Sequence, residues 1–181
     1  VTPEYTTKLT SIATPVRYRP YVVKEEKIFL TAKQAGDAAS MEQATIQILK
    51  NCTFNQLDIE ALPSFDLEYL FLNIRAKSVG EVVKLEYRHT GGINYKGMTC
   101  EAITPVEINL EQVKVDKNPK HTNKIQLDDK LGMELRYPNI NDVKQVSEGK
   151  DEIEMLAKCI VSVYDDENVY DPDNLQDAID F

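Results

Sequence analysis

The chain has 181 residues, of which 42% are hydrophobic, and a formal net charge of −9 at pH 7. A globular chain of this length buries roughly 70% of its unfolded surface, which is enough for one core without disulfide staples. No apolar run reaches the ~18 residues of a membrane span, and the three cysteines fit no disulfide framework, which indicates reduced thiols.

The negative charge is concentrated at the C-terminal end. Residues 151–181 contain ten acidic residues and one lysine, so residues 1–150 are neutral. We therefore expect a single body over 1–150, followed by an amphipathic helix and an acidic extension over 151–181. A neutral body with an acidic tail argues against nucleic-acid binding. The tail is either a solvated segment or a docking segment for a basic partner. In the second case the candidate contact residues are Asp165, Asp166 and Glu167.

The N-terminal third is expected to begin as β structure and to continue as helices. In "PVRYRPYVV" Val16 and Tyr18 share one face, which is typical of a strand. Helices are predicted over 24–35 and 39–52, and Gly36 is placed to end the first. Cys52 falls on the apolar stripe of the second helix, so we expect a core thiol rather than a reactive one.

The stretch "LPSFDLEYLFLNIRAKSVGE" predicts a third helix over 66–78, with Asp66 as its N-cap and Gly80 at its end. At 100° per residue, one apolar stripe consists of Leu67, Leu70, Phe71 and Ile74. The opposite stripe consists of Tyr69, Leu72 and Ala76. Such a helix needs two covers, the core on one side and either a second layer of the chain or a partner on the other. Tyr69, Leu72 and Ala76 are therefore the candidate partner-interface residues.

After Gly80 the period of the sequence changes to two. Strands are predicted over 82–88 and 105–111 and a hairpin over 124–137, with Val83, Leu85 and Tyr87 pointing inward. An amphipathic helix is predicted over 152–164, and a further helix is expected from about Asn174. These elements together predict an α+β fold in which antiparallel hairpins follow a helical N-terminal part.

The sequence offers no catalytic or cofactor-binding cluster. It lacks a glycine-rich phosphate loop and a nucleophile motif, and nothing brings a cysteine near His89 or His121. The 89–104 segment resembles a zinc-ribbon knuckle only in retaining His89 and Cys100, and two ligands do not hold a structural zinc. We therefore predict no metal, no cofactor, no small-molecule substrate and no enzyme activity.

Four stretches resemble, in order and spacing, the baseplate hub protein family of T4-like contractile-tailed bacteriophages. They are "VRYRPYVVKEEKIFL", "ILKNCTFNQLDIEALPSFDLEYLFLNIRAKSVGE", "VEINLEQVKV" and "IQLDDKLGMELRYP", within residues 15–170. The resemblance implies a non-enzymatic hub component or hub assembly factor whose partners are other baseplate hub or tail proteins. It implies synthesis in the host bacterial cytoplasm and, for a component, a place in the virion tail. The alternative is a small metal-binding or regulatory interaction module, and the residues leave this choice open.

Overall fold

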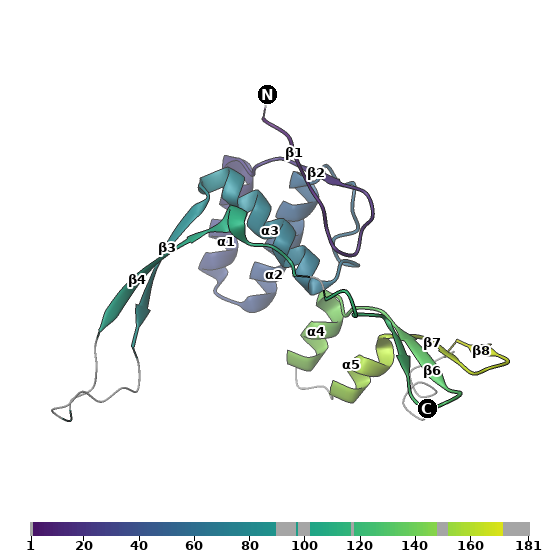
Figure 1. Cartoon of the computed structure of the whole chain (residues 1–181). Coiled ribbons are helices and arrows are strands. Elements are labelled where there is room, and N and C mark those ends of the chain that lie inside the picture. Colours follow the sequence, from purple (N-terminus) through teal and green to yellow (C-terminus); the bar gives the residue numbers. More distant parts are fainter. Residues whose placement is uncertain (1, 90–96, 98–101, 117, 148–151, 172–181) are drawn as a thin grey trace.

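The computed structural model describes residues 2–89, 97, 102–116, 118–147 and 152–171. These residues form a helical lobe (2–80), a two-stranded arm (β3 and β4) and a smaller C-terminal lobe (118–147 with 152–171), as Figure 1 shows. Helices and antiparallel strands are both present, so the predicted α+β fold is confirmed. No helix among the described residues is long and apolar enough to span a membrane.

The helical lobe contains a short hairpin followed by three helices in the part of the chain that the structure describes. Its elements are β1 (Tyr5–Thr7), β2 (Val16–Tyr18), α1 (Val23–Ala35), α2 (Ala38–Cys52) and α3 (Ser64–Val79). The helix bounds agree with the predicted ranges to within two residues. Gly36 ends α1 at a φ of 78°, a left-handed conformation that glycine adopts without strain.

Asp66 does not cap α3, and the prediction for this residue was wrong. The helix begins two residues earlier, with Pro63 at the N-cap position. The Asp66 carboxylate is fully buried and accepts hydrogen bonds from the backbone N–H groups of Thr10 (2.8 Å) and Ser11 (2.7 Å). Because the β1–β2 loop brings two donors that need an acceptor, the carboxylate binds this loop instead of its own helix.

The core of the helical lobe lies between α2, α3 and the β1–β2 hairpin. Ile48, Leu49, Leu70 and Ile74 have no exposed surface and pack in one cluster. Phe71 is half-buried and its ring lies edge-on to Phe29 at 5.7 Å between centroids. The first apolar stripe of α3 therefore faces the core, as its helical spacing indicates.

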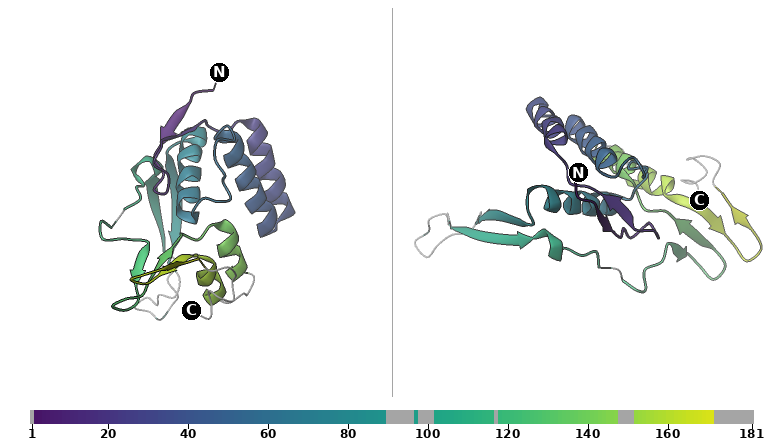
Figure 2. Two further views of the ribbon diagram at one scale, coloured as in Figure 1. Left: turned by 90° about the vertical axis from the view of Figure 1, so that its right-hand side faces the viewer. Right: turned by 90° about the horizontal axis from the view of Figure 1, so that it is seen from above.

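The arm pairs β3 (Val82–Arg88) with β4 (Ile103–Asn109) in antiparallel register, and η1 (Leu110–Gln112) follows directly. The prediction that Val83, Leu85 and Tyr87 point inward was wrong for two of them, since Leu85 is 38% and Tyr87 62% exposed. Figure 1 and the right-hand view of Figure 2 show the reason: the arm projects away from the helical lobe, so no other described element covers it. Its base is held where η1 packs against α3.

The C-terminal lobe combines a four-stranded sheet with two helices. Its elements are β5 (Lys124–Gln126), β6 (Gly132–Leu135), α4 (Ile140–Ser147), α5 (Glu152–Lys158), β7 (Ile160–Tyr164) and β8 (Val169–Tyr170). The strands follow one another in chain order across the sheet. The predicted 124–137 hairpin is present as β5 and β6, whereas α4 and β8 had no counterpart in the sequence analysis. The expected helix from Asn174 lies outside the described residues.

The predicted helix over 152–164 was wrong in its second half. The helix ends at Lys158, and residues 160–164 form β7, in which Val163 pairs with Met133 of β6. β-Branched residues prefer strands, and the open edge of β6 supplies the hydrogen bonds. The sheet thus combines strands from before and after residue 150, and the expected division at that residue stays a prediction.

Candidate interaction surfaces

Within the second stripe of α3, one residue is buried and two are half-buried. Ala76 is 4% exposed, and Tyr69 is half-buried against the core cluster. Leu72 is also half-buried. Of the two covers that the sequence analysis left open, the chain itself supplies the one over Ala76. Tyr69 keeps some exposed area and stays a candidate partner contact. Whether Leu72 contacts a partner stays a prediction.

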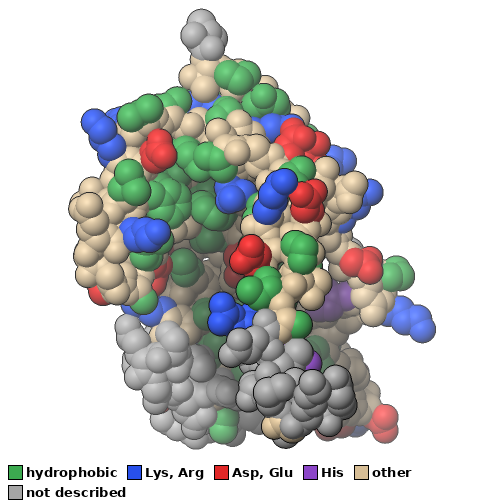
Figure 3. All heavy atoms as spheres, turned by 90° about the vertical axis from the view of Figure 1, so that its left-hand side faces the viewer, with side chains coloured by type: hydrophobic (Ala, Val, Ile, Leu, Met, Phe, Trp, Pro, Cys, Tyr) green, Lys and Arg blue, Asp and Glu red, His purple; other side chains and the backbone are tan. Residues whose placement is uncertain are grey.

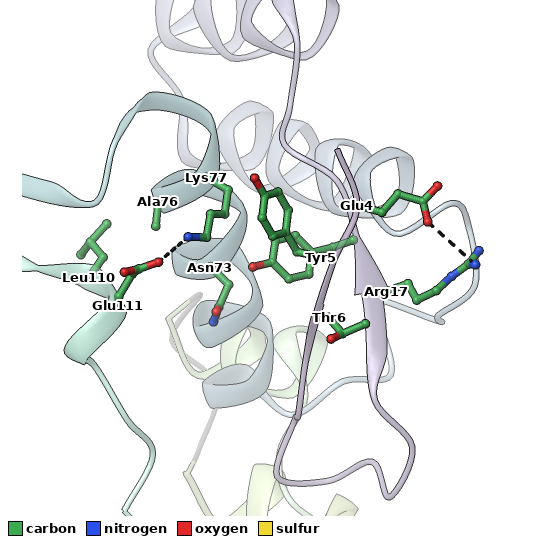
Figure 4. Close-up of a pocket in the computed structure, with 10 residues that line it drawn as sticks. Glu4, Tyr5, Thr6, Arg17, Asn73, Ala76, Lys77, Leu110 and Glu111 are labelled. Atoms are coloured by element: carbon green, nitrogen blue, oxygen red, sulfur yellow. Dashed lines mark hydrogen bonds and ion pairs between the residues drawn. The ribbon is translucent and has the colours of Figure 1, made fainter. Parts of the chain in front are cut away.

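A cleft of about 720 Å³ runs beside α3, between the β1–β2 hairpin and η1 (Figure 4). Lys77 lies at its centre and donates hydrogen bonds to the carboxylates of Glu111 and of Glu81, the latter at 3.0 Å. Its ammonium also lies 5.4 Å from the centre of the Tyr5 ring. The hydrogen bond to Glu111, and then that to Glu81, raise the pKa of Lys77.

These contacts show what Lys77 does in the folded chain. One ammonium ties the C-terminal turn of α3 to η1, which follows β4, and to the first strand. The Lys77 ammonium is bound by groups of the chain itself, so it is not available to bind a ligand at the centre of the cleft. We interpret the cleft as the clamp that holds the base of the arm, not as a ligand site.

The arm has two chemically different faces. On one face, cross-strand partners place Val83 beside Ile108 and Leu85 beside Val106. On the other face Lys84 and Glu107 form an ion pair at 2.9 Å, and both side chains are largely exposed. The strands therefore alternate between apolar and polar residues as strands that border a core do, but among the described residues no core covers the apolar face of the arm.

Charge on the side from which the arm projects is mixed. Figure 3 shows Lys and Arg side chains interspersed with Asp, Glu and hydrophobic ones on this face. A surface that binds nucleic acid needs a cluster of Lys and Arg side chains with few acidic ones among them. This side of the molecule is better suited to a protein partner that combines apolar contact with individual ion pairs.

The acidic segment that the sequence analysis singled out forms the turn between β7 and β8. The carboxylate of Asp165 accepts hydrogen bonds from the backbone N–H groups of Glu167 (2.8 Å) and Asn168 (2.7 Å). These hydrogen bonds lower the pKa of Asp165. Asp166 and Glu167 are exposed. Asp165 thus shapes the turn, and the two following acids carry its outward charge.

The cleft between the lobes was not anticipated from the sequence. Pro63 and Asn139 form an isolated antiparallel bridge, and the rings of Phe65 and Tyr137 meet edge-on at 5.0 Å. Beside them lies an open cleft of about 970 Å³. Phe65 lies on α3 and Tyr137 in the loop after β6, more than seventy positions further along the chain. No local sequence pattern indicates this contact, so only the tertiary structure could reveal it.

The residues considered for chemistry are dispersed. Cys52 is fully buried, and burial raises the pKa of its thiol to about 11. His121 stacks on Tyr137, with 2.8 Å between its Nε2 and the tyrosine hydroxyl. His89 is exposed at the end of β3, and Cys100, the other half of the considered zinc pair, lies outside the described residues. Within the described residues, no three His, Cys, Asp or Glu side chains gather where they could hold a metal.

Comparison with protein families gives a match over nearly the whole chain. A family model described as T4 bacteriophage base plate protein matches residues 2–180. This range includes the helical lobe, the arm and the C-terminal lobe together. The comparisons with curated proteins and with solved structures gave no match.

Proposed function

Since the chain belongs to the T4 bacteriophage base plate protein family, we propose that it is a non-enzymatic structural or assembly protein of the baseplate hub. A structural protein of a phage tail acts through the surfaces that it presents to neighbouring chains. The relevant question is therefore which surfaces of this chain are available for such contacts. The partners under this proposal are other baseplate hub or tail proteins, without nucleic acid, membrane or small-molecule substrate.

The observation that carries the proposal is the uncovered apolar face of the arm. Leu85 and Tyr87 are 38% and 62% exposed, and they lie on the face that an alternating strand normally buries. A contiguous apolar surface on a projecting element marks a protein-interaction site. The base of the arm is fixed by Lys77 and its two carboxylate partners, so the surface is presented in a defined direction.

Two smaller surfaces are proposed as additional contacts. Leu72 has remaining exposed area on α3, and Asp166 and Glu167 offer negative charge to a basic partner. Tyr69, Ala76 and Asp165 were proposed with them, but each is engaged within the chain. We expect these three to support the contact surfaces rather than to dominate binding.

Under this proposal the protein is made in the host bacterial cytoplasm and acts in, or during the building of, the tail baseplate. Mass spectrometry of purified virions separates the two roles. A peptide signal stoichiometric with other tail proteins identifies a hub component. Absence from virions together with presence on baseplate intermediates from infected cells identifies an assembly factor. Absence from both would contradict the proposal.

The hub position is tested by cross-linking mass spectrometry on intermediates isolated through a tag on this chain. Cross-links to proteins of the central hub are expected. Cross-links confined to the peripheral parts of the baseplate would refute the hub assignment while leaving the family membership intact. A variant with Leu85 and Tyr87 both changed to Ser tests the role of the arm. The two substitutions remove its apolar face, so the variant should remain folded and lose these cross-links.

A further inference from the structure

The outer edge of β3 carries unpaired backbone groups. Leu110 N–H donates to the Glu81 carbonyl (2.8 Å) and His89 N–H to the Ala102 carbonyl (3.0 Å), which fixes the hydrogen-bonded pairs of the hairpin. In an antiparallel pair such positions alternate. The N–H and C=O groups of Val83, Leu85 and Tyr87 therefore point to β4. Those of the residues between them point away from it.

The outward-pointing backbone groups of β3 belong to Val82, Lys84, Glu86 and Arg88. No third strand joins the sheet among the described residues, so these groups are available to a further strand. The outer edge of β4 differs, because Pro105 occupies an outward-pointing position and has no N–H to donate. Proline on an edge strand blocks the addition of another strand. Of the two described edges of the arm, the β3 edge is thus the one without such an interruption.

The sequence of β3 is complementary to itself in antiparallel orientation. With a twofold axis at Leu85, Val83 lies opposite Tyr87 of the second copy, and Leu85 lies opposite its own equivalent. Lys84 lies opposite Glu86 of the second copy, and this pair occurs twice. These pairs are favourable, being apolar on one face and of opposite charge on the other. The outermost pair places Val82 opposite Arg88 of the second copy, which is neither apolar nor oppositely charged.

The hydrogen-bonding pattern permits this register, and the charges then favour it over its neighbours. Lys84 and Glu86 both direct their backbone groups outward, so they meet as a hydrogen-bonded pair, whereas Leu85 forms a non-hydrogen-bonded pair with its equivalent. Moving the axis to Lys84 places two lysines opposite each other, and moving it to Glu86 places two glutamates opposite each other. Both shifts are destabilising. Centring on Leu85 also uses all seven residues of the strand.

We propose that two copies of this chain pair through β3, in antiparallel orientation about a twofold axis at Leu85. The two arms then form one four-stranded sheet, held by up to about eight backbone hydrogen bonds between the copies. The apolar faces of both arms become continuous across the axis. The pairing depends only on residues of β3, so it holds whether the chain acts in the hub or elsewhere in the baseplate.

A cysteine placed on the axis tests the register directly. In a Cys100→Ser background, Leu85→Cys brings two thiols to a non-hydrogen-bonded pair, where Cβ atoms are about 4.5–5.5 Å apart and close to disulfide distance. We expect a disulfide-linked dimer on a non-reducing gel after mild oxidation. The matched control is Val83→Cys, whose thiols would lie about 13 Å apart along the strands and should stay unlinked.

A charge reversal tests the pairing without a covalent link. Among the described residues of the arm Glu86 has no ionic partner, because Pro105 lies opposite it. Glu86→Lys therefore leaves the hairpin intact but places lysines opposite each other across the axis. We expect a dimer dissociation constant at least ~10-fold higher by analytical ultracentrifugation. Glu68→Lys on the exposed side of α3 makes the same charge change and should leave the constant unaltered.

A charge-swapped variant completes the test. Lys84→Glu with Glu86→Lys restores opposite charges across the axis, and Glu107→Lys restores the ion pair within the arm. This triple variant should dimerise as the wild type does. The proposal is overturned if the wild-type chain remains a monomer throughout the accessible concentrations, or if Val83→Cys cross-links as readily as Leu85→Cys. It is equally overturned if a wild-type dimer is indifferent to Glu86→Lys, since the interface then lies elsewhere. Far-UV circular dichroism verifies that each variant is folded.

Discussion

Helix α3 and strand β3 both carry large apolar side chains at regular spacing, but those of α3 are largely buried and those of β3 are largely exposed. Leu70 and Ile74 of α3 have no exposed surface, whereas Leu85 of β3 is 38% and Tyr87 62% exposed. The difference lies in what each element packs against, because α3 lies within a lobe and β3 projects from it (Figure 1). Periodicity states which face is apolar, and the covering of that face depends on the rest of the molecule or on a partner.

The largest expected effect comes from creating a cavity under α3. Leu70→Ala should lower the free energy of unfolding by about 2–5 kcal/mol, because the neighbouring core residues relax only in part. Leu85→Ala is the matched change in the arm and should cost less than about 1 kcal/mol. Urea titrations followed by circular dichroism measure both. Similar losses at the two positions would show that the arm is covered in solution.

The next effect concerns the buried carboxylate that holds the β1–β2 loop against α3. Asp66→Ala leaves the N–H groups of Thr10 and Ser11 without their acceptor and should cost about 2–3 kcal/mol. Asp66→Asn retains one acceptor oxygen and should cost less. The same urea titrations provide the comparison. If the two variants were equally stable, hydrogen bonding to the loop would not be the source of the loss.

A smaller effect, dependent on pH, is expected in the C-terminal lobe. The Arg136 guanidinium donates to the Asp142 carboxylate at 2.6 and 3.1 Å and holds the pKa of that carboxyl below its usual range. The stabilisation is therefore present above the ordinary pKa of about 4 and is lost as the pH falls through the lower folded value.

Asp142→Asn should thus cost about 1 kcal/mol at pH 7, a modest value because solvent screens the partly exposed Arg136. The difference from the wild type should shrink as the pH falls below about 4. Urea titrations at pH 7 and at pH 3 measure it. A constant difference at both pH values would mean that the ion pair does not titrate in this range.

The smallest effect on stability is expected at Leu72, on the half-buried side of α3. If its stripe faces a partner, Leu72→Asp should melt near the wild-type temperature while baseplate assembly fails. Thermal melts and complementation of a phage lacking the gene measure the two properties. An unfolded variant would instead assign Leu72 to the internal core, and the interface at this helix would be lost.

The sequence predicted much of the fold because several elements are specified locally. Helix α1 ends where Gly36 permits a left-handed residue, and α3 runs to Gly80 as its apolar spacing indicates. The alternation in β3 and β4 gave strands of the expected type. The family resemblance, carried by four local stretches, agrees with the family match over residues 2–180.

The remaining features depended on contacts between distant segments. Residues 160–164 continue an amphipathic pattern from α5, and pairing with β6 on one side and β8 on the other makes them a strand. Asp66 is well placed to cap a helix, and only the β1–β2 loop supplies competing donors. The burial of the apolar residues also depended on such contacts, since Ala76 is 4% exposed whereas Leu85 and Tyr87 of the arm are exposed.

The sequence by itself determined the type of most elements, the apolar face of each and the neutrality of the body. These properties follow from dihedral preferences and side-chain periods that act over a few residues. The tertiary structure alone decided which apolar face is covered, which carboxylate meets which donor and which strand edge stays open. Each of these depends on groups that come from positions far apart in the chain. Local conformational preferences do not predict which distant segments meet.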